Sequence, residues 1–277
     1  MRRFRYVVAD VFTDTPLAGN QLAVFTDARD LDSVTMQALA KEMAFSETVF
    51  VLPAQAAGAD VRIRIFTPAS ELRFAGHPIL GTAFVLGGPL QKIVLRLETG
   101  SGVVPVELER EGATIVFGWM EQPLPTWRPV ERADELLAAL GVERSGLPVE
   151  VYDNGLAHVY VALDSEDAVA SLDPDWQRLS KLGAVGINCF AGSGAKGKTR
   201  MFAPEFGVAE DPATGSAAGP LALHLARHGE IGFGDEIEIV QGVEIERPSK
   251  LHAVAHSPED IAVGGSAVIV ARGEFRI

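Results

Sequence analysis

Apolar and polar residues alternate along many short segments of this chain. In the segment Arg62-Ile63-Arg64-Ile65-Phe66, charged and apolar side chains follow one another with a period of two, which is the signature of a half-buried strand. The other predicted strands cover residues 6–12, 22–25, 48–52, 93–98, 103–109, 114–119, 149–152, 158–163, 187–190 and 200–202, and more follow from Ile237 onward. The pattern therefore predicts a strand-rich fold.

Helical periodicity is confined to a few segments. One predicted helix begins after a possible N-cap at Asp32 and runs to about Met43 with one apolar face, and two others cover residues 131–140 and 173–182. The segment from Pro78 to Leu86 is apolar all the way round. A helix that is apolar on every side is surrounded by protein, so we expect this helix at the centre of a domain.

An internal repeat predicts that there are two such domains. Arg64-Ile65-Phe66-Thr67-Pro68 precedes Gly76-His77 and the apolar helix, and Arg200-Met201-Phe202-Ala203-Pro204 precedes Gly215-Ser216 and a second helix over 216–228. We predict an α+β fold of two pseudo-symmetric domains, each a strand barrel around a central helix. The proline-rich segment after residue 121 divides residues 1–121 from 122–277, and the last strand is free to return to the first domain. Pseudo-twofold symmetry would bring both helix starts to one interdomain cleft.

Charge and cysteine content narrow the choice of partners. The chain has 24 Lys and Arg against 37 Asp and Glu, so its net charge of −13 disfavours nucleic acid and anionic membranes. No apolar run has the roughly 18 residues of a membrane span, and the N-terminus lacks the pattern of a signal peptide. A single cysteine, Cys189, excludes an intramolecular disulfide and fits a reducing compartment. These features predict a cytoplasmic protein.

Two motifs that suggest a cofactor or a metal have simpler interpretations. Residues 192–199 match the phosphate-loop pattern G-x-x-x-x-G-K-T, but they precede a strand signal ending at Pro204 instead of the helix that must hold the phosphates. We therefore expect a hairpin turn there. His224 and His228 have a spacing that suits a metal, yet the pattern lacks the glutamate of zinc proteases, and His228 is expected to interact with the helix C-terminus. The sequence predicts no cofactor and no metal.

The starts of the two central helices are the best candidates for chemistry. Glu210 to Pro220 forms a loop that becomes a helix, where Thr214 or Ser216 is suited to cap the first turn and free N–H groups can bind an anion. His77 and Asp211 are polar groups at the two helix starts. For each of them, capping the helix or stabilising the loop is the alternative to a role in chemistry. Glu47 stands between a helix end and an apolar strand, where desolvation would raise its pKa, although a solvated acid in a turn is as plausible.

At these residues the chain resembles the PhzF-like family of phenazine biosynthesis, within the diaminopimelate epimerase-like superfamily. Seven blocks carry the resemblance in order along nearly the whole chain. They are residues 16–20 (PLAGN), 45–48 (FSET), 62–68 (RIRIFTP), 74–78 (FAGHP), 188–192 (NCFAG), 211–220 (DPATGSAAGP) and 241–245 (QGVEI).

The resemblance implies a cofactor-independent isomerase of trans-2,3-dihydro-3-hydroxyanthranilate, a small anionic precursor of an aromatic product. It implies that Glu47 is the acid/base, that His77 and Asp211 assist, and that the protein is a homodimer. The residues implied to bind the substrate are Ser46, Gly76, Gly215 and Ser216. The related racemases use two cysteines, which this chain does not have. An isomerase or epimerase acting on another small cyclic or amino-acid substrate, or a non-catalytic binding protein of the same fold, are the alternatives.

Overall fold

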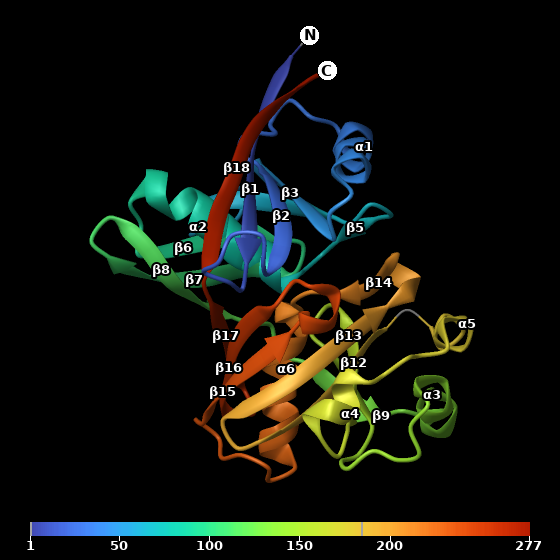
Figure 1. Cartoon of the computed structure of the whole chain (residues 1–277). Coiled ribbons are helices and arrows are strands. Elements are labelled where there is room, and N and C mark those ends of the chain that lie inside the picture. The colour runs from blue at the N-terminus through green and yellow to red at the C-terminus, as the bar shows by residue number, and fades with distance from the viewer. Residues whose placement is uncertain (1, 184) are drawn as a thin grey trace. The chain divides into compact units, whose positions relative to one another are not determined.

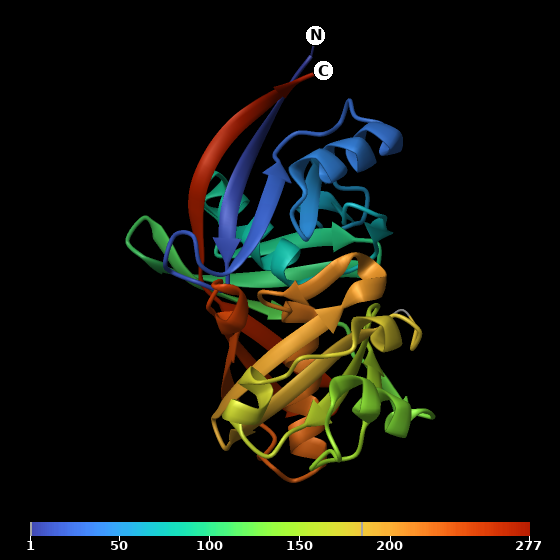
Figure 2. The same cartoon turned by 45° about the vertical axis from the view of Figure 1, so that its right-hand side comes forward.

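A computed structural model describes residues 2–183 and 185–277 of the chain (Figure 1). The chain forms two compact units: the first unit comprises Met1–Gln122 with Val263–Ile277, and the second comprises Pro123–Ala262. The second unit is shorter than the expected 122–277, because strand β18 (Ala267–Arg276) pairs antiparallel with β1 (Arg3–Val11) of the first unit. Figure 2 shows β18 running alongside β1, with both chain termini at the same end of this pair.

The first unit wraps its strands around a single long helix, α2 (Gly76–Leu90). This helix contacts strands from both ends of the unit's sequence, from β1 to β18, and its residues from Gly76 to Val85 are buried. The apolar helix predicted from Pro78 is therefore confirmed. The other elements of the first unit are β2 (Asn20–Phe25), α1 (Ser33–Met43), β3 (Glu47–Leu52), β4 (Val61–Phe66), β5 (Glu71–Leu72), β6 (Val94–Thr99), β7 (Gly102–Glu111) and β8 (Thr114–Glu121), while β17 (Asp260–Gly265) spans the boundary between the units.

Helix α1 covers the outer side of the strands β2, β3 and β4. The predicted N-cap is confirmed, since the Asp32 carboxylate accepts a 2.7 Å hydrogen bond from the Thr35 amide. Aromatic residues form the apolar layer beneath the helix: the Phe25 and Phe50 rings stack at 4.9 Å and Phe66 meets Phe50 edge-on. This layer fixes the strand β3, whose first residue is Glu47.

The second unit repeats this plan around helix α6 (Gly215–Arg227). All residues of α6 from Gly215 to His224 are buried. Its other elements are β9 (Thr126–Pro129), α3 (Ala133–Leu140), β10 (Glu150–Asp153), β11 (Ala157–Ala162), α4 (Glu166–Ala170), α5 (Trp176–Leu179), β12 (Gly186–Ser193), β13 (Lys196–Ala203), η1 (Pro204–Phe206), β14 (Val208–Asp211), β15 (Glu236–Gln241), η2 (Val243–Ile245) and β16 (Ser249–Ser257).

Two sequence predictions in the second unit need correction. Residues 126–129, expected to be a linker, form β9, because Trp127 and its neighbours pair with β10. The helix expected over 173–182 is only α5, since the Asp175 carboxylate caps the Arg178 amide and thereby sets the first turn.

Strand register confirms the repeat. Phe66 pairs with Glu71 on the next strand, and Phe202 pairs with Glu210 in the same way. In both units the arginine two residues before the phenylalanine forms two hydrogen bonds to that glutamate and lies 5.0 Å from the phenylalanine ring. The two units are thus built on the same arrangement of strands, each followed by its central helix.

None of the helices in the described residues is long and apolar enough to cross a membrane.

Candidate active site

Glu47 and His77 meet in the first unit. Glu47 is the first residue of β3 and pairs in parallel register with Leu22, while His77 is the second residue of α2. The Nε2 atom of His77 lies 3.5 Å from Oε2 of Glu47, and only 4% of the histidine side chain and 15% of the glutamate side chain are exposed. A carboxylate and an imidazole therefore share a mostly desolvated position at the start of the central helix. Ser46, half-buried, directly precedes this glutamate.

Burial keeps the His77 ring neutral. It lowers the pKa of His77 to about 3, although a backbone hydrogen bond with Gln21 opposes the shift. The contact with Glu47 is therefore not an ion pair at neutral pH. The side-chain amide nitrogen of Asn20 lies 3.2 Å from Nδ1 of His77, and because an amide nitrogen only donates, Nδ1 accepts. With the Asn20 amide as donor, the ring proton is assigned to Nε2, the nitrogen that lies nearer to Glu47.

A hydrogen-bond network fixes the start of α6 in the second unit. The Thr214 hydroxyl donates 2.6 Å to the Asp211 carboxylate, and the Gln241 amide nitrogen donates to the Asp211 carbonyl at 2.8 Å and to the Thr214 hydroxyl at 2.9 Å. The N-cap is Thr214, but neither its side chain nor that of Ser216 makes the expected capping bond, because the Thr214 hydroxyl is engaged by Asp211 and Gln241. Asp211 is thus held rigidly just before the helix, and only 6% of the residue is exposed.

Ser216, the second residue of α6, is held by His158. The Nε2 atom of His158 lies 3.0 Å from the Ser216 hydroxyl oxygen, and the Asn188 amide nitrogen lies 3.3 Å from Nδ1 of His158. Burial lowers the pKa of His158 to about 3, so its ring is neutral. Since Asn188 donates to Nδ1, Nε2 donates to the serine oxygen. The hydroxyl of Ser216 consequently keeps its own proton for another acceptor.

Pro220 lies inside α6 and removes one backbone hydrogen bond of the helix. The carbonyl of Ser216, four residues earlier, is the group that loses its partner. The Asn154 amide donates 2.9 Å to that carbonyl, and the Tyr160 hydroxyl donates 2.7 Å to the carbonyl of Ala217. These side chains let the helix begin with small residues without leaving buried carbonyls unsatisfied.

The two units differ at the position of Glu47. Glu47 immediately precedes Thr48, which pairs with Phe66, and in the second unit Gly186 immediately precedes Ile187, which pairs with Phe202. Gly186 therefore occupies the position that corresponds to Glu47. A Cβ atom at Gly186 would lie 2.6 Å from Nδ1 of His158, so this place is kept free for the histidine that holds Ser216. Within the repeat, only the first unit carries a carboxyl group at this point.

Two other sequence interpretations are confirmed. The glycine- and lysine-rich segment is a hairpin, in which Ser193 at the end of β12 pairs with Lys196 at the start of β13. Cys189 is fully buried, and burial raises the pKa of its thiol to about 12, so it behaves as a small apolar residue.

His224 and His228 also meet a carboxylate, a contact that the local sequence pattern does not indicate. The Oε2 atom of Glu150 lies 3.3 Å from His224 and 3.1 Å from His228, within a group that has the spacing of metal ligands. The same oxygen accepts hydrogen bonds from Arg227 at 2.8 Å and from the Tyr152 hydroxyl at 2.9 Å. Burial alone would raise the pKa of Glu150, but bonds from His228, Arg227 and Tyr152 lower it to about 2. Arginine thus already supplies the positive charge that a metal would bring.

The sequence indicates the residues at each helix start but not the residues that hold them in place. Ser46, Glu47, Gly76 and His77 belong to the first unit, whereas Asp211, Gly215 and Ser216 belong to the second. The supporting residues not identified as such are Asn20, Asn154, His158, Asn188 and Gln241. A signal did exist for some of them, since Asn20, Asn188 and Gln241 lie in blocks quoted above.

Known proteins match this chain along nearly its whole length. A model of the family described as "phenazine biosynthesis-like protein" matches residues 9–273. The chain belongs to this family. Among the relatives of this phenazine biosynthesis-like protein, the trans-2,3-dihydro-3-hydroxyanthranilate isomerase of Pseudomonas chlororaphis is 51% identical over 272 residues, covering 97% of this chain and 98% of that one.

Solved structures confirm the fold expected of a phenazine biosynthesis-like protein. A predicted epimerase from Pseudomonas aeruginosa is 33% identical, with a TM-score of 0.84 over 98% of this chain and 99% of that chain. A probable proline racemase from Agrobacterium radiobacter K84 is 13% identical, with a TM-score of 0.66 over 99% of this chain and 93% of that chain, a likeness of fold alone. The predicted α+β fold, of the type shared with the epimerases and racemases, is therefore confirmed.

Proposed function

We propose that this protein is a cofactor-independent isomerase of trans-2,3-dihydro-3-hydroxyanthranilate. The observation that carries the proposal is the 51% identity, over nearly the full length of both chains, to a protein named for this activity. The desolvated pair of Glu47 and His77 supports it, because a general base beside a neutral imidazole is suited to moving a proton.

In the proposed reaction, the Glu47 carboxylate takes a proton from one ring carbon and returns it to another. One C–H bond breaks and one forms, so the substrate isomerises without an oxidant or a leaving group. His77, with its proton on Nε2, stabilises the carboxylate and keeps it oriented. The repeat supports a single acid/base, because Gly186 stands in the second unit where the first has Glu47.

Substrate binding is assigned to the two helix starts. Ser46 and the Gly76 amide in the first unit, and Gly215 and Ser216 in the second, are the proposed donors to the anionic substrate. The Ser216 hydroxyl keeps a proton to donate because His158 satisfies its oxygen. Helix N–H groups supply positive potential that the net charge of −13 does not. Asp211, fixed by Thr214, is proposed to orient the substrate by accepting a hydrogen bond.

A second candidate is an epimerase or isomerase acting on another small cyclic substrate. It is favoured by the 33% identity to the predicted epimerase from Pseudomonas aeruginosa. The Glu47 and His77 geometry would serve either reaction.

One incubation separates these candidates. We expect the purified protein to convert trans-2,3-dihydro-3-hydroxyanthranilate in deuterated water into an isomer of the same elemental composition, partly carrying solvent deuterium, as measured by mass spectrometry. Label without conversion would indicate proton exchange on a substrate that is not the natural one. If the compound binds but neither turns over nor exchanges, the protein is a binding module and the proposal is wrong.

A further inference from the structure

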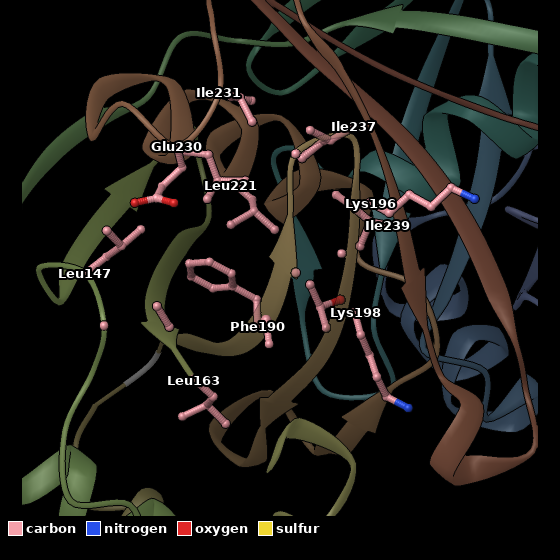
Figure 3. Close-up of a pocket in the computed structure, with 18 residues that line it drawn as sticks. Leu147, Leu163, Phe190, Lys196, Lys198, Leu221, Glu230, Ile231, Ile237 and Ile239 are labelled. Carbon is pink, nitrogen blue, oxygen red and sulfur yellow. The ribbon is translucent and has the colours of Figure 1, made fainter. Parts of the chain in front are cut away.

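The second unit contains a pocket that the proposed reaction does not use. Its volume is about 170 Å³, and it lies between α6 and the strands β12, β13 and β15. Apolar side chains surround the Phe190 ring in Figure 3. They belong to Leu147, Leu163, Leu221, Ile231, Ile237 and Ile239.

The pocket lies beside α6 beyond the first turn of the helix. Leu221 and Leu225 line it, and they follow Gly215 by six and ten residues along the helix. At a rise of about 1.5 Å per residue, these side chains lie roughly 9 and 15 Å along the helix axis from its start. A molecule in the pocket would therefore not occupy the position proposed for the substrate at Ser216.

The repeat explains why β13 leaves room here. Gly197 pairs in parallel with Ile239, and Val61 of the first unit pairs in the same way with Leu97. Residues 197, 199 and 201 share one face of the strand, and Thr199 on that face bonds Gln241 inside the unit. Strand β13 thus has no side chain where β4 has a valine, and Gly197 lines the pocket.

Charges around the pocket disfavour an anion. Figure 3 shows the side chains of Lys196 and Lys198 directed away from the Phe190 ring. Each already has a carboxylate partner, since Lys198 pairs with Glu244 and Lys196 lies 4.0 Å from Glu238. The exposed Glu230 also lines the pocket and offers a carboxylate as a hydrogen-bond acceptor. The hairpin over residues 192–199 therefore lines the pocket but brings no unpaired positive charge to a ligand there.

We propose that this pocket binds a small neutral aromatic molecule of one ring that carries a hydrogen-bond donor, with the ring among the apolar side chains and the donor directed to Glu230. The size is appropriate, because a cavity of about 150 Å³ lined by Leu, Ile and Phe holds a benzene molecule. An arylamine has the required chemistry: an apolar face, one N–H donor and no negative charge. This site is independent of the proposed isomerase activity, because it is defined by binding alone.

Aniline and benzoate are suitable probes, since they share the ring and differ in charge. We expect aniline to cause saturable changes in the amide resonances of residues 190–199, measured by heteronuclear NMR on the full-length protein. Benzoate should bind about tenfold more weakly or not at all, equivalent to about 1.4 kcal/mol. Benzoate binding as tight as that of aniline would overturn the assigned ligand class.

A filling substitution tests the location. Gly146 lines the pocket and a Cβ atom there would lie 3.8 Å from Ala162, which also lines it, so Gly146→Leu adds an apolar side chain without a backbone clash. The matched control is Gly88→Leu in α2, where a Cβ atom meets nothing within 4 Å. We expect aniline binding to be lost in the first variant and retained in the second. Unchanged binding in Gly146→Leu, or no saturable binding to the parent protein, would overturn the proposal.

Discussion

The Asn20 amide determines which nitrogen of His77 carries the ring proton. It lies 3.2 Å from Nδ1, which leaves the proton on Nε2, 3.5 Å from the Glu47 carboxylate. Asn188 has the same relation to His158 in the second unit, at 3.3 Å, but His158 contacts Ser216 instead of a carboxylate. Each asparagine thus contacts the Nδ1 atom of a buried histidine, but one histidine faces the proposed acid/base and the other a proposed substrate-binding hydroxyl.

This difference predicts separate kinetic effects. Replacing Asn20 by Asp puts an acceptor beside Nδ1, favours the other tautomer and raises the pKa of His77, so kcat should fall by about tenfold or more and become dependent on pH. Asn188→Asp, the matched control, should instead raise KM, because it reorients His158 and the serine hydroxyl. Steady-state kinetics from pH 5 to 8 would measure both. Equal effects of the two variants on kcat and KM would indicate a merely structural role for both asparagines.

The central helices are the elements that the sequence predicts best. An apolar run without a polar face, as in 78–86, has only one stable environment, and the Phe-x-Pro repeat marks the strand before each helix. The starts of these helices were harder to predict. A local pattern indicates that Thr214 or Ser216 is a cap, but Gln241, which is distant in sequence, takes part in the network that engages the Thr214 hydroxyl.

The sequence predicts short elements less well, because they too depend on contacts with residues that are distant in the sequence. Strand β9 lies in a segment with three prolines, and its strand character comes from pairing with β10, which no local pattern reveals. Asn154 likewise lies outside any recognisable motif, although it satisfies the carbonyl that Pro220 leaves free. A side chain that hydrogen-bonds a backbone group far away in the sequence cannot be identified from the residues next to it.

For the whole molecule, the sequence repeat predicted two like units, and strand register confirms it. Residues 263–277 return to the first unit, which the sequence leaves open. A C-terminal strand whose residues alternate in exposure can pair with the free edge strand of either unit. Of the candidate site, Glu47, His77, Asp211 and Ser216 were identified from the sequence together with the family resemblance. The histidine and amides that support them were not.

Three buried histidines predict how stability depends on pH. Burial lowers the pKa of His77 and His158 to about 3, and burial together with His228 lowers that of His224 to about 4. The unfolded chain takes up these protons below about pH 6.5 while the folded chain does not. Stability should therefore be complete above pH 6.5 and decrease as the pH falls towards 5, with a limiting slope of about 4 kcal/mol per pH unit.

Urea unfolding at several pH values between 7 and 5 would give this slope. His77→Gln removes one of the three protonation sites, so its slope should be about two thirds of that of the parent protein. A free energy of unfolding that is constant over this range would show that the three rings are charged in the folded protein, contrary to the burial described above.

The central claim is that one carboxyl group, that of Glu47, moves the proton. The most direct measurement is the turnover of trans-2,3-dihydro-3-hydroxyanthranilate by Glu47→Gln in deuterated water, with Glu71→Gln on strand β5 of the same unit as a control for the loss of a charge. We predict that Glu47→Gln keeps its circular dichroism spectrum and loses both turnover and deuterium incorporation by about 10³-fold or more, whereas Glu71→Gln retains both. Near-normal turnover by folded Glu47→Gln would contradict the account.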